Sequence, residues 1–248
     1  MHKKDILLKI TQIKDLLKKW SWEYYDDDSP TIDDSVYDEK LNELFSLEEE
    51  YPEFVTNDSP TQTVGSLKSS SFKKVKHEVS MLSLKNAFNN EDLLHFNKQV
   101  SSFDRDFTYF IEPKIDGISV SLKYHNGKLI QGLTRGDGTV GEDITENVKQ
   151  IVNIPLNIDY MSPLEVRGEI YLPLSNFKKI NDKKREDGKT PFANPRNAAA
   201  GTMRQLDPLV ARARKLKLFC YIGIDIDSGK ERWNSQKETI ENFAKLGF

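Results

Sequence analysis

The pair Asn126-Gly127 constrains the fold of this 248-residue chain more than any other feature of the sequence. Apolar and polar residues alternate on both sides of it, in the runs GISVSLKYH and KLIQGLTR. Asn-Gly between two alternating runs is the strongest short signal of a β-hairpin, because both turn residues must adopt positive φ. We therefore predict an antiparallel pair of strands near the middle of the chain.

The first fifty residues have a helical period instead. Apolar residues recur three and four positions apart over 3–25, and again after Asp33 and Asp34, which supply a cap and first-turn acids for a second helix. Tyr51-Pro52 ends that helix. Residues 56–72 are rich in Ser, Thr and Gly. We predict a helical hairpin followed by a linker or an irregular crossing segment.

The rest of the chain combines the two periods. The run FTYFIEP predicts a strand before the hairpin, with Lys114 in a tight turn between that strand and the next. Further predicted elements are strands in LEVRGEIYL and KLKLFCYIGIDI, and helices at 174–187, at 195–205 behind the cap Asn194, and at 235–246. The predicted class is α+β, an N-terminal helical hairpin followed by a mainly antiparallel sheet with flanking helices.

Composition excludes several classes of protein. Cys220 is the only cysteine, which rules out internal disulfides and a cysteine-based zinc site within the chain and fits a reducing, cytoplasmic location. No apolar run approaches the roughly 18 residues that a membrane helix needs. The N-terminal residues lack the apolar core of a signal peptide. A membrane-spanning or secreted protein is therefore not expected.

The net charge of −3 conceals two surfaces of opposite sign. Residues 1–66 carry 7 lysines against 16 Asp and Glu, or 7 − 16 = −9, whereas residues 167–217 carry 13 Lys and Arg against 5, or 13 − 5 = +8. One interpretation is that both segments are solvated faces. The other is functional, since the acidic segment would repel DNA and the basic one could neutralise phosphates.

The stretch EPKIDG, at 112–117, places a lysine between two carboxylates and just before a glycine. A lysine in such a place is usually a solvated edge residue or half of a weak ion pair, yet it can also be a nucleophile. A lysine amine attacks an electrophile only when neutral, and the flanking carboxylates favour its charged form. A nucleophilic Lys114 would therefore need a nearby cation, for which Arg135 and Arg167 are candidates.

A second motif points to a different class of enzyme. Residues 136–141 match G-x-G-x-x-G, the fingerprint of dinucleotide-binding oxidoreductases, and Asp159 lies near the offset of a ribose-binding acid. The strand before them, however, is the return leg of an antiparallel hairpin, whereas that fold needs parallel connections. Glu142 and Asp143 would also repel a pyrophosphate. Both features argue against a dinucleotide-binding oxidoreductase.

Taken together, the motifs resemble the bacterial NAD-dependent DNA ligases. The matching motifs are EPKIDG, YYDDDSPTIDDSVYD, SPTQTVG, MLSLKNAF, LTRGDGTVGEDITENV, VRGEIYL, FANPRNAAAGTMRQLDP and FCYIGI, in the family's order. The resemblance covers almost the whole chain. It implies a nucleotidyltransferase fold of the ATP-grasp-like ligase type, with a helical subdomain at 1–68 that binds the nicotinamide mononucleotide (NMN) half of NAD, and an adenylation domain at 69–248.

The resemblance also implies roles for individual residues. Lys114 would be the nucleophile that becomes adenylated. The other residues implied are, at the NMN end, Tyr24, Tyr25, Asp34, Ser35, Val36, Tyr37 and Asp38; at the adenosine end, Ser83, Leu84, Glu112, Asp116, Gly117, Arg135, Glu169 and Tyr221; and, facing DNA phosphates, Arg196 and Arg204. Among these, Glu112 would accept from the adenine amino group, Glu169 would bind a ribose hydroxyl and Tyr221 would stack on adenine.

The implied cofactors are NAD and Mg²⁺, and the implied partner is nicked double-stranded DNA, bound by a monomer. The sequence ends at Phe248 and does not contain the family's later motifs, which include a second lysine motif and the zinc site. We therefore expect an adenylation domain that is incomplete at its C-terminus and slow or inactive by itself. The alternative is a non-catalytic remnant that binds NAD, or that binds nucleic acid through the basic segment 167–217.

Overall fold

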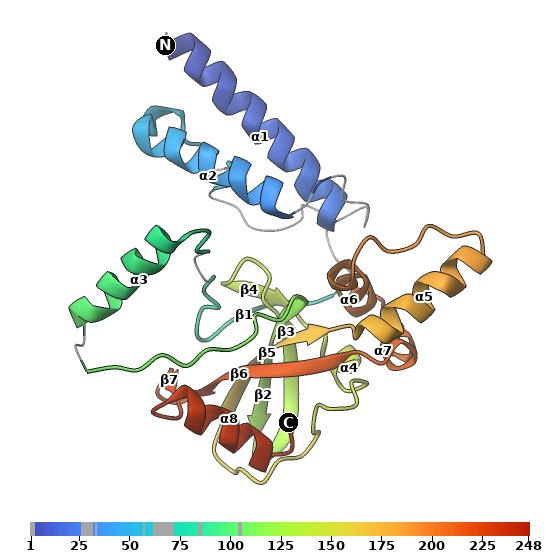
Figure 1. The fold of residues 1–248 in the computed structure, drawn as a ribbon. Helices are drawn as coiled ribbons and strands as arrows, with labels where there is room; N and C mark the ends of the chain where they lie inside the picture. Colours follow the sequence, from blue (N-terminus) through green and yellow to red (C-terminus); the bar gives the residue numbers. More distant parts are fainter. Residues whose placement is uncertain are drawn as a thin grey trace.

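The computed structural model describes residues 3–25, 32, 34–56, 58–61, 72–83, 86–103 and 106–248, except for a few side chains within the first two helices. Two long helices, α1 (Lys3–Tyr25) and α2 (Asp34–Glu50), lie antiparallel to each other (Figure 1). Their buried contact consists of Ile6, Ile10, Ile13 and Leu17 from α1 and Leu44 from α2. The predicted helical hairpin is confirmed, and Asp33, expected at its second cap, lies outside the described residues.

A buried ion pair fastens the chain that follows α2 to this hairpin. Lys14 Nζ lies 2.9 Å from Glu48 Oε1 and donates to Phe54 O at 2.9 Å. The same oxygen, Glu48 Oε1, accepts from the hydroxyl of Ser59 at 2.7 Å, and Glu48 Oε2 accepts from the hydroxyl of Thr61. Burial tends to raise the pKa of Glu48, but the hydrogen bonds from Ser59, Thr61 and Lys14 outweigh it and hold this pKa below its usual value.

The second part of the chain is built on a five-stranded antiparallel sheet (Figure 1). Its strands, in the spatial order β3-β2-β5-β6-β7, are β3 (Lys128–Thr134), β2 (Ile118–His125), β5 (Leu164–Tyr171), β6 (Lys217–Asp225) and β7 (Lys230–Glu231). The β2–β3 turn has Asn126 at φ 50° and Gly127 at φ 73°, as the Asn-Gly signal predicts. The antiparallel sheet and the strands predicted at β2, β3, β5 and β6 are confirmed.

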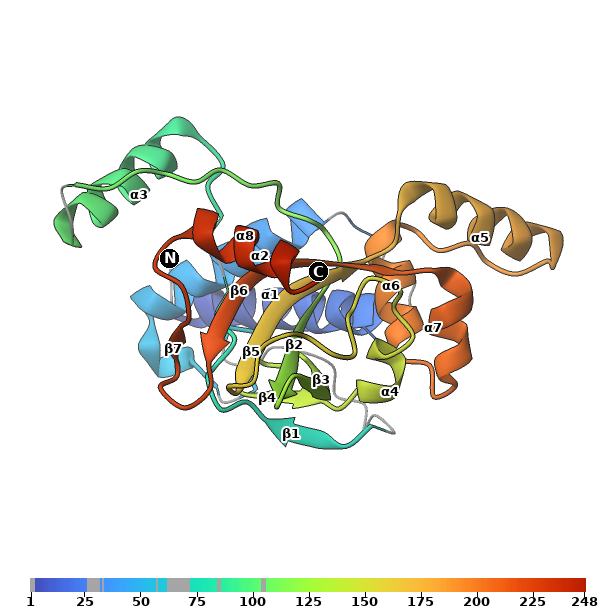
Figure 2. The same cartoon turned by 90° about the horizontal axis from the view of Figure 1, so that it is seen from below.

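Shorter elements surround this sheet. They are the two-stranded ladder of β1 (Lys74–Lys76) and β4 (Val140–Glu142), the 3-10 turn η1 (Pro52–Phe54), and the helices α3 (Asn90–Phe103), α4 (Thr145–Val148), α5 (Leu174–Glu186), α6 (Pro195–Met203), α7 (Pro208–Arg214) and α8 (Gln236–Lys245). The predicted helices α5, α6 and α8 are confirmed, including the Asn194 cap, whose side chain accepts from Asn197 N. Figure 2 shows α6 and α7 gathered at one end of the sheet, opposite β7.

The two faces of the five-stranded sheet differ in polarity. One face buries Val120, Leu122, Val166 and Ile170 against α4, α6, α7 and α8, and forms the main core. Because side chains alternate along a strand, the opposite face presents the polar residues between them. These are Ser119, Ser121, Lys123, Glu165, Arg167 and Glu169. A sheet with one apolar and one polar face can place ionisable groups on rigid strands.

The strand predicted at 107–113 is wrong. Residues 107–116 lie outside every helix and strand, and no backbone hydrogen bond joins them to any other residue that the structure describes. The alternation in FTYFIEP has the period of a strand, but a strand also needs a partner for its backbone groups. Lys114 therefore lies in an unpaired segment that leads into β2, and not in a tight turn between two paired strands.

Candidate functional site

Three residues form a row across the polar face of the sheet. Ser119 of β2 lies directly opposite Glu169 of β5, and its hydroxyl donates to Glu169 Oε2 at 2.7 Å. On the other side of β2, Arg135 N donates to Ser119 O at 3.0 Å. The order Arg135, Ser119, Glu169 is thus fixed by the pairing of three neighbouring strands. Sequence analysis identified Arg135 and Glu169, but not the serine between them.

A bulge in β6 adds Tyr221 to this row. Gly168 pairs with Cys220 and Arg167 pairs with Ile222, so Tyr221 is an extra residue with no partner of its own in β5. Its phenol is hydrogen-bonded to Ser119 and lies within electrostatic reach of Glu169. Burial, and then the charge of Glu169, raise the pKa of the Tyr221 hydroxyl. A neutral phenol and a carboxyl group therefore share one serine.

Three cations lie within electrostatic range of Glu169. Burial raises the pKa of this carboxyl group, while the Ser119 hydrogen bond and then the charges of Arg196, Lys114 and Arg135 act in the opposite direction. Lys114 and Arg135, two predicted site residues, thus lie within electrostatic range of Glu169, and Arg135 also lies within range of Tyr221. The structure also adds Arg196, which sequence analysis had expected to face DNA.

Two side-chain contacts hold the segment that carries Lys114. On one side of the lysine, Glu112 Oε2 accepts from Gln236 Nε2 of α8 at 2.7 Å. On the other side, Asp116 Oδ1 lies 3.4 Å from Arg196 Nη1 at the start of α6. The two carboxylates that flank the lysine in sequence are therefore bound to other elements. Lys114 itself is exposed.

Gly117 marks the point where this segment enters the sheet. A Cβ atom at Gly117 would lie 2.1 Å from the carbonyl oxygen of Ile170 in β5, which is far closer than any van der Waals contact. Only glycine lets the backbone approach β5 this closely. The spacing in Lys-x-Asp-Gly thus places the lysine three residues before a fixed point on the central strands.

The residues from 72 to 83 cross the polar face. Arg167 donates to Val79 O and, at 3.0 Å, to Ser80 O, and its Nε donates to Glu165 Oε1 at 2.7 Å. Arg167, considered from sequence as a cation for Lys114, is instead buried against this crossing segment. At its end Ser83 Oγ accepts from Arg135 Nη1 at 3.4 Å, so Ser83 does reach the row.

A cavity of about 410 Å³ opens beside Glu112. It lies between α3 and the unpaired segment, and its lining residues are Leu93, Phe96, Asn97, Tyr109, Phe110, Ile111 and Glu112. Tyr109 is fixed there, since its hydroxyl donates to Asn97 Oδ1 at 2.8 Å. A mostly apolar cavity with a carboxylate in its lining suits a flat, apolar group that carries hydrogen-bond donors.

The remaining predicted site residues lie elsewhere. Val36 and Tyr37 belong to α2, where Tyr37 OH and Ser21 Oγ are 2.8 Å apart. Arg204 is the C-terminal cap of α6, one residue beyond the helix, and not within it. The side chains of Tyr24, Tyr25, Asp34, Ser35 and Asp38, and the whole of Leu84, lie outside what the structure describes.

Two searches of the described part of the chain gave negative results. No group of three or more His, Cys, Asp or Glu side chains among those residues is arranged to hold a metal ion. None of the helices there has the length and the apolar composition to cross a membrane.

Comparison with known families identifies two matching regions. The family described as "NAD-dependent DNA ligase adenylation domain" matches residues 69–248. The family described as "DNA ligase-like, N-terminal NAD+-binding domain" matches residues 3–65. Together the two regions account for nearly all of the chain.

Two curated proteins show similarity over at least 98% of this chain. The DNA ligase of Mycoplasma capricolum is 49% identical over 250 residues, which cover 100% of this chain and 37% of that protein. The DNA ligase of Staphylococcus saprophyticus is 48% identical over 244 residues, which cover 98% of this chain and 36% of that protein. The chain thus spans a little over a third of the length of these relatives.

Proposed function

This chain belongs to the family of NAD-dependent DNA ligases, and we propose that it performs the first step of ligation, the transfer of AMP from NAD to Lys114. The observation that carries the proposal is the position of Lys114, beside the Asp116–Arg196 ion pair and, with Arg135, within electrostatic range of the Ser119–Glu169 pair on the polar face of the sheet. Residues 1–68 would act as the NMN-binding subdomain and residues 69–248 as the adenylation domain.

In the proposed step, the neutral amine of Lys114 attacks the α-phosphorus of the AMP half of NAD in line. A nitrogen–phosphorus bond forms and the bond from phosphorus to the NMN oxygen breaks. NMN leaves with that electron pair, and the amine loses its proton to solvent. Arg135 and Arg196 would offset the negative charge that grows on the phosphate oxygens. Glu169, oriented by Ser119, would accept from a ribose hydroxyl.

The residues present fit the adenosine half of NAD. Glu112 Oε1 accepts no hydrogen bond from the part of the chain that the structure describes, so it can accept from the adenine amino group. Tyr221, on its bulge, offers a ring for stacking. Asp116, exposed two residues after Lys114, offers a carboxylate oxygen for Mg²⁺, which would lower the negative charge of the phosphate.

The NMN half would lie against the helical hairpin. Asp38, Tyr37 and Tyr24 are the residues that the resemblance places there, and Asp38→Ala should weaken NAD binding without changing helix content. Glu39→Ala, a change at the exposed neighbouring position, is the matched control. Calorimetry that gives the same NAD affinity for Asp38→Ala as for wild type would exclude this role for Asp38.

The later steps of the reaction belong to the longer relatives. There the AMP would pass to the 5′-phosphate of nicked double-stranded DNA, and a 3′-hydroxyl would then displace it. Arg196 and Arg204 would contribute phosphate contacts from this chain. The protein would act as a monomer in the cytoplasm, and the buried, unpaired thiol of Cys220 agrees with that location.

Mass spectrometry of the purified chain with NAD and magnesium tests the proposal. We expect one AMP on the peptide that contains Lys114, a slow reaction for this chain, and a faster one when the downstream part of its relatives is added. Lys114→Ala should remove the AMP, whereas Lys128→Ala, at an exposed lysine of β3, should not. An extended chain that stayed free of AMP would contradict the proposal and favour a non-catalytic NAD-binding or nucleic-acid-binding role.

A further inference from the structure

Gln236 links two residues of the candidate nucleotide site that are far apart in sequence. Its side-chain amide donates to Glu112 Oε2 at 2.7 Å and to Tyr221 O at 3.0 Å. Both partners are pure acceptors, so the group that faces them must be the NH₂ of the glutamine, and each of its hydrogens has one acceptor. The amide therefore ties the unpaired segment at Glu112 to the bulge of β6 at Tyr221.

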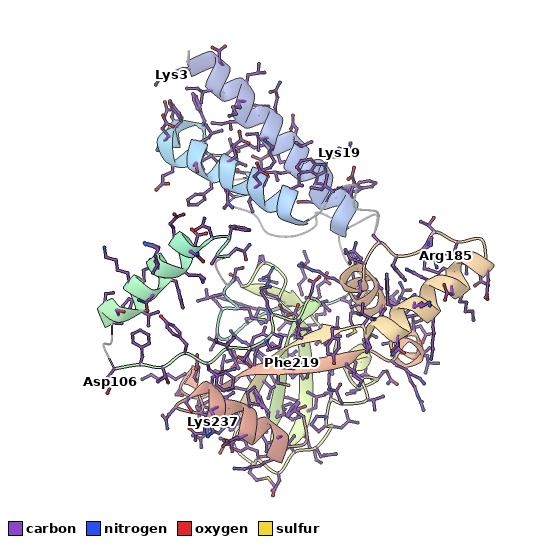
Figure 3. All side chains as sticks on the ribbon, viewed as in Figure 1. Lys3, Lys19, Asp106, Arg185, Phe219 and Lys237 are labelled. Carbon is purple, nitrogen blue, oxygen red and sulfur yellow. The ribbon has the colours of Figure 1, made fainter. Side chains whose placement is uncertain are left out.

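The helix that carries Gln236 holds this residue in place. It is the first residue of α8, just after the cap Ser235, whose hydroxyl accepts from Glu238 N at 3.2 Å. Helix α8 is anchored in the main core through Phe243, which is 3% exposed. The next residue, Lys237, projects outward in Figure 3 and is exposed. Gln236 is thus a fixed donor at the edge of the site.

The side chain of Glu112, in contrast, is held mainly by its hydrogen bond from Gln236. Its backbone belongs to residues 107–116, which form no backbone hydrogen bond with the rest of the described chain. Without Gln236 the carboxylate could rotate about its side-chain bonds and meet a ligand from many directions. With Oε2 bound to the amide, the carboxylate keeps a single orientation, and Oε1 stays beside the cavity that Glu112 lines.

We propose that Gln236 is a positioning residue that sets the choice of purine base, by holding Glu112 as a fixed acceptor for the exocyclic amine of adenine. A base with a carbonyl oxygen in place of that amine would bring an acceptor against a carboxylate, and both would lose their partners. The inference rests on the proposed function, because it assumes that Glu112 faces the base of the bound dinucleotide. Gln236 acts through Glu112 and does not itself touch the base.

The experiment compares two dinucleotides by calorimetry on the whole chain. One is NAD, and the other is nicotinamide hypoxanthine dinucleotide, which carries a carbonyl oxygen where adenine has its amine. Wild type should bind NAD more tightly. Gln236→Ala and the isosteric Gln236→Glu should lower the ratio of the two affinities by about tenfold or more, chiefly through weaker NAD binding.

Controls separate positioning from folding. Lys237→Ala, one residue further along α8, should keep the wild-type ratio. A ratio between two ligands does not change when a variant merely lowers the fraction of folded protein, and thermal unfolding of each variant measures that fraction directly. A Gln236→Ala protein with the wild-type ratio would overturn the inference while leaving the proposed function intact. Equal affinity of wild type for both dinucleotides would overturn the assignment of Glu112 and the inference with it.

Discussion

The hydroxyl of Ser119 donates to Glu169 at 2.7 Å, across the two central strands of the sheet. The pair lies at the centre of the candidate site, with Arg135 on the side of Ser119 and Tyr221 on the side of Glu169. The hydrogen bond stabilises the charged form of a carboxyl group whose pKa is raised by burial. Removal of this hydrogen bond should therefore change how AMP attachment depends on pH.

In Ser119→Ala the pKa of Glu169 should rise further, because the ionised carboxylate loses a donor. The acid limb of the pH–rate profile for AMP attachment should then move to higher pH, and the rate below neutral pH should fall by about tenfold. Ser121→Ala is the matched control, since Ser121 lies on the same face of β2 but donates to Glu165. A Ser119→Ala profile that overlays the wild-type profile would contradict this role.

Gly117→Ala should destabilise the adenylation domain by about 2–3 kcal/mol. The new Cβ would lie 2.1 Å from the carbonyl oxygen of Ile170, so one of the two central strands must shift. Gly188→Ala is the control, because Gly188 has φ 67° but open space around it, and should cost only about 1 kcal/mol. Urea denaturation measures both. Equal losses for the two variants would show that the close approach to β5 is not the cause.

Glu48→Gln should destabilise the helical hairpin by about 3 kcal/mol, since it leaves the buried charge of Lys14 without its partner. The pKa of Glu48 is lowered in the folded protein, so its contribution to stability is present above pH 4.5 and is lost as the pH falls below it. The difference between wild type and variant should shrink accordingly. Thermal melts at several pH values test this, and the exposed variant Glu53→Gln should melt like wild type.

Replacement of Arg196 and of Arg204 should have the same effect on DNA binding but different effects on AMP attachment. If both contact phosphates, each change to alanine should lower the slope of DNA affinity against salt by about one unit. Arg196→Ala should also slow AMP attachment, because Arg196 holds Asp116 beside Lys114, whereas Arg204→Ala should not. Arg185→Ala, at the far end of α5 in Figure 3, is the control for both measurements. An unchanged salt slope in Arg204→Ala would favour pairing within the protein surface.

Local patterns in the sequence predicted much of this fold. Asn126-Gly127 gave the central hairpin, and the cap Asn194 with Pro195 gave the start of α6. The run FTYFIEP was misleading, because alternation reports the period of side chains and not whether the backbone has a partner. The short elements β1, β4, α4 and α7 have three to seven residues each and are held by their contacts, so no period could reveal them.

The candidate site shows a similar division. Lys114, Arg135, Glu169 and Tyr221 were predicted through motifs, and the charges of Lys114 and Arg135 act on Glu169, which in turn acts on Tyr221. Ser119 and Gln236 were missed, although both touch these residues. Gln236 lies 124 positions from Glu112, and neither residue belongs to a motif that names the other. Contacts over such separations arise from the packing of whole elements, which a single sequence does not display.

The missing backbone pairing of residues 107–116 has a mechanical consequence. A residue within a strand can move only when the sheet around it deforms, whereas Lys114 is held through the side chains of Glu112 and Asp116. If Glu112 or Asp116 changed its partner, Lys114 could move by about the length of a side chain without any deformation of the sheet. The amine of Lys114 therefore sits on a tethered arm, attached at Gly117 to the central strands of the sheet.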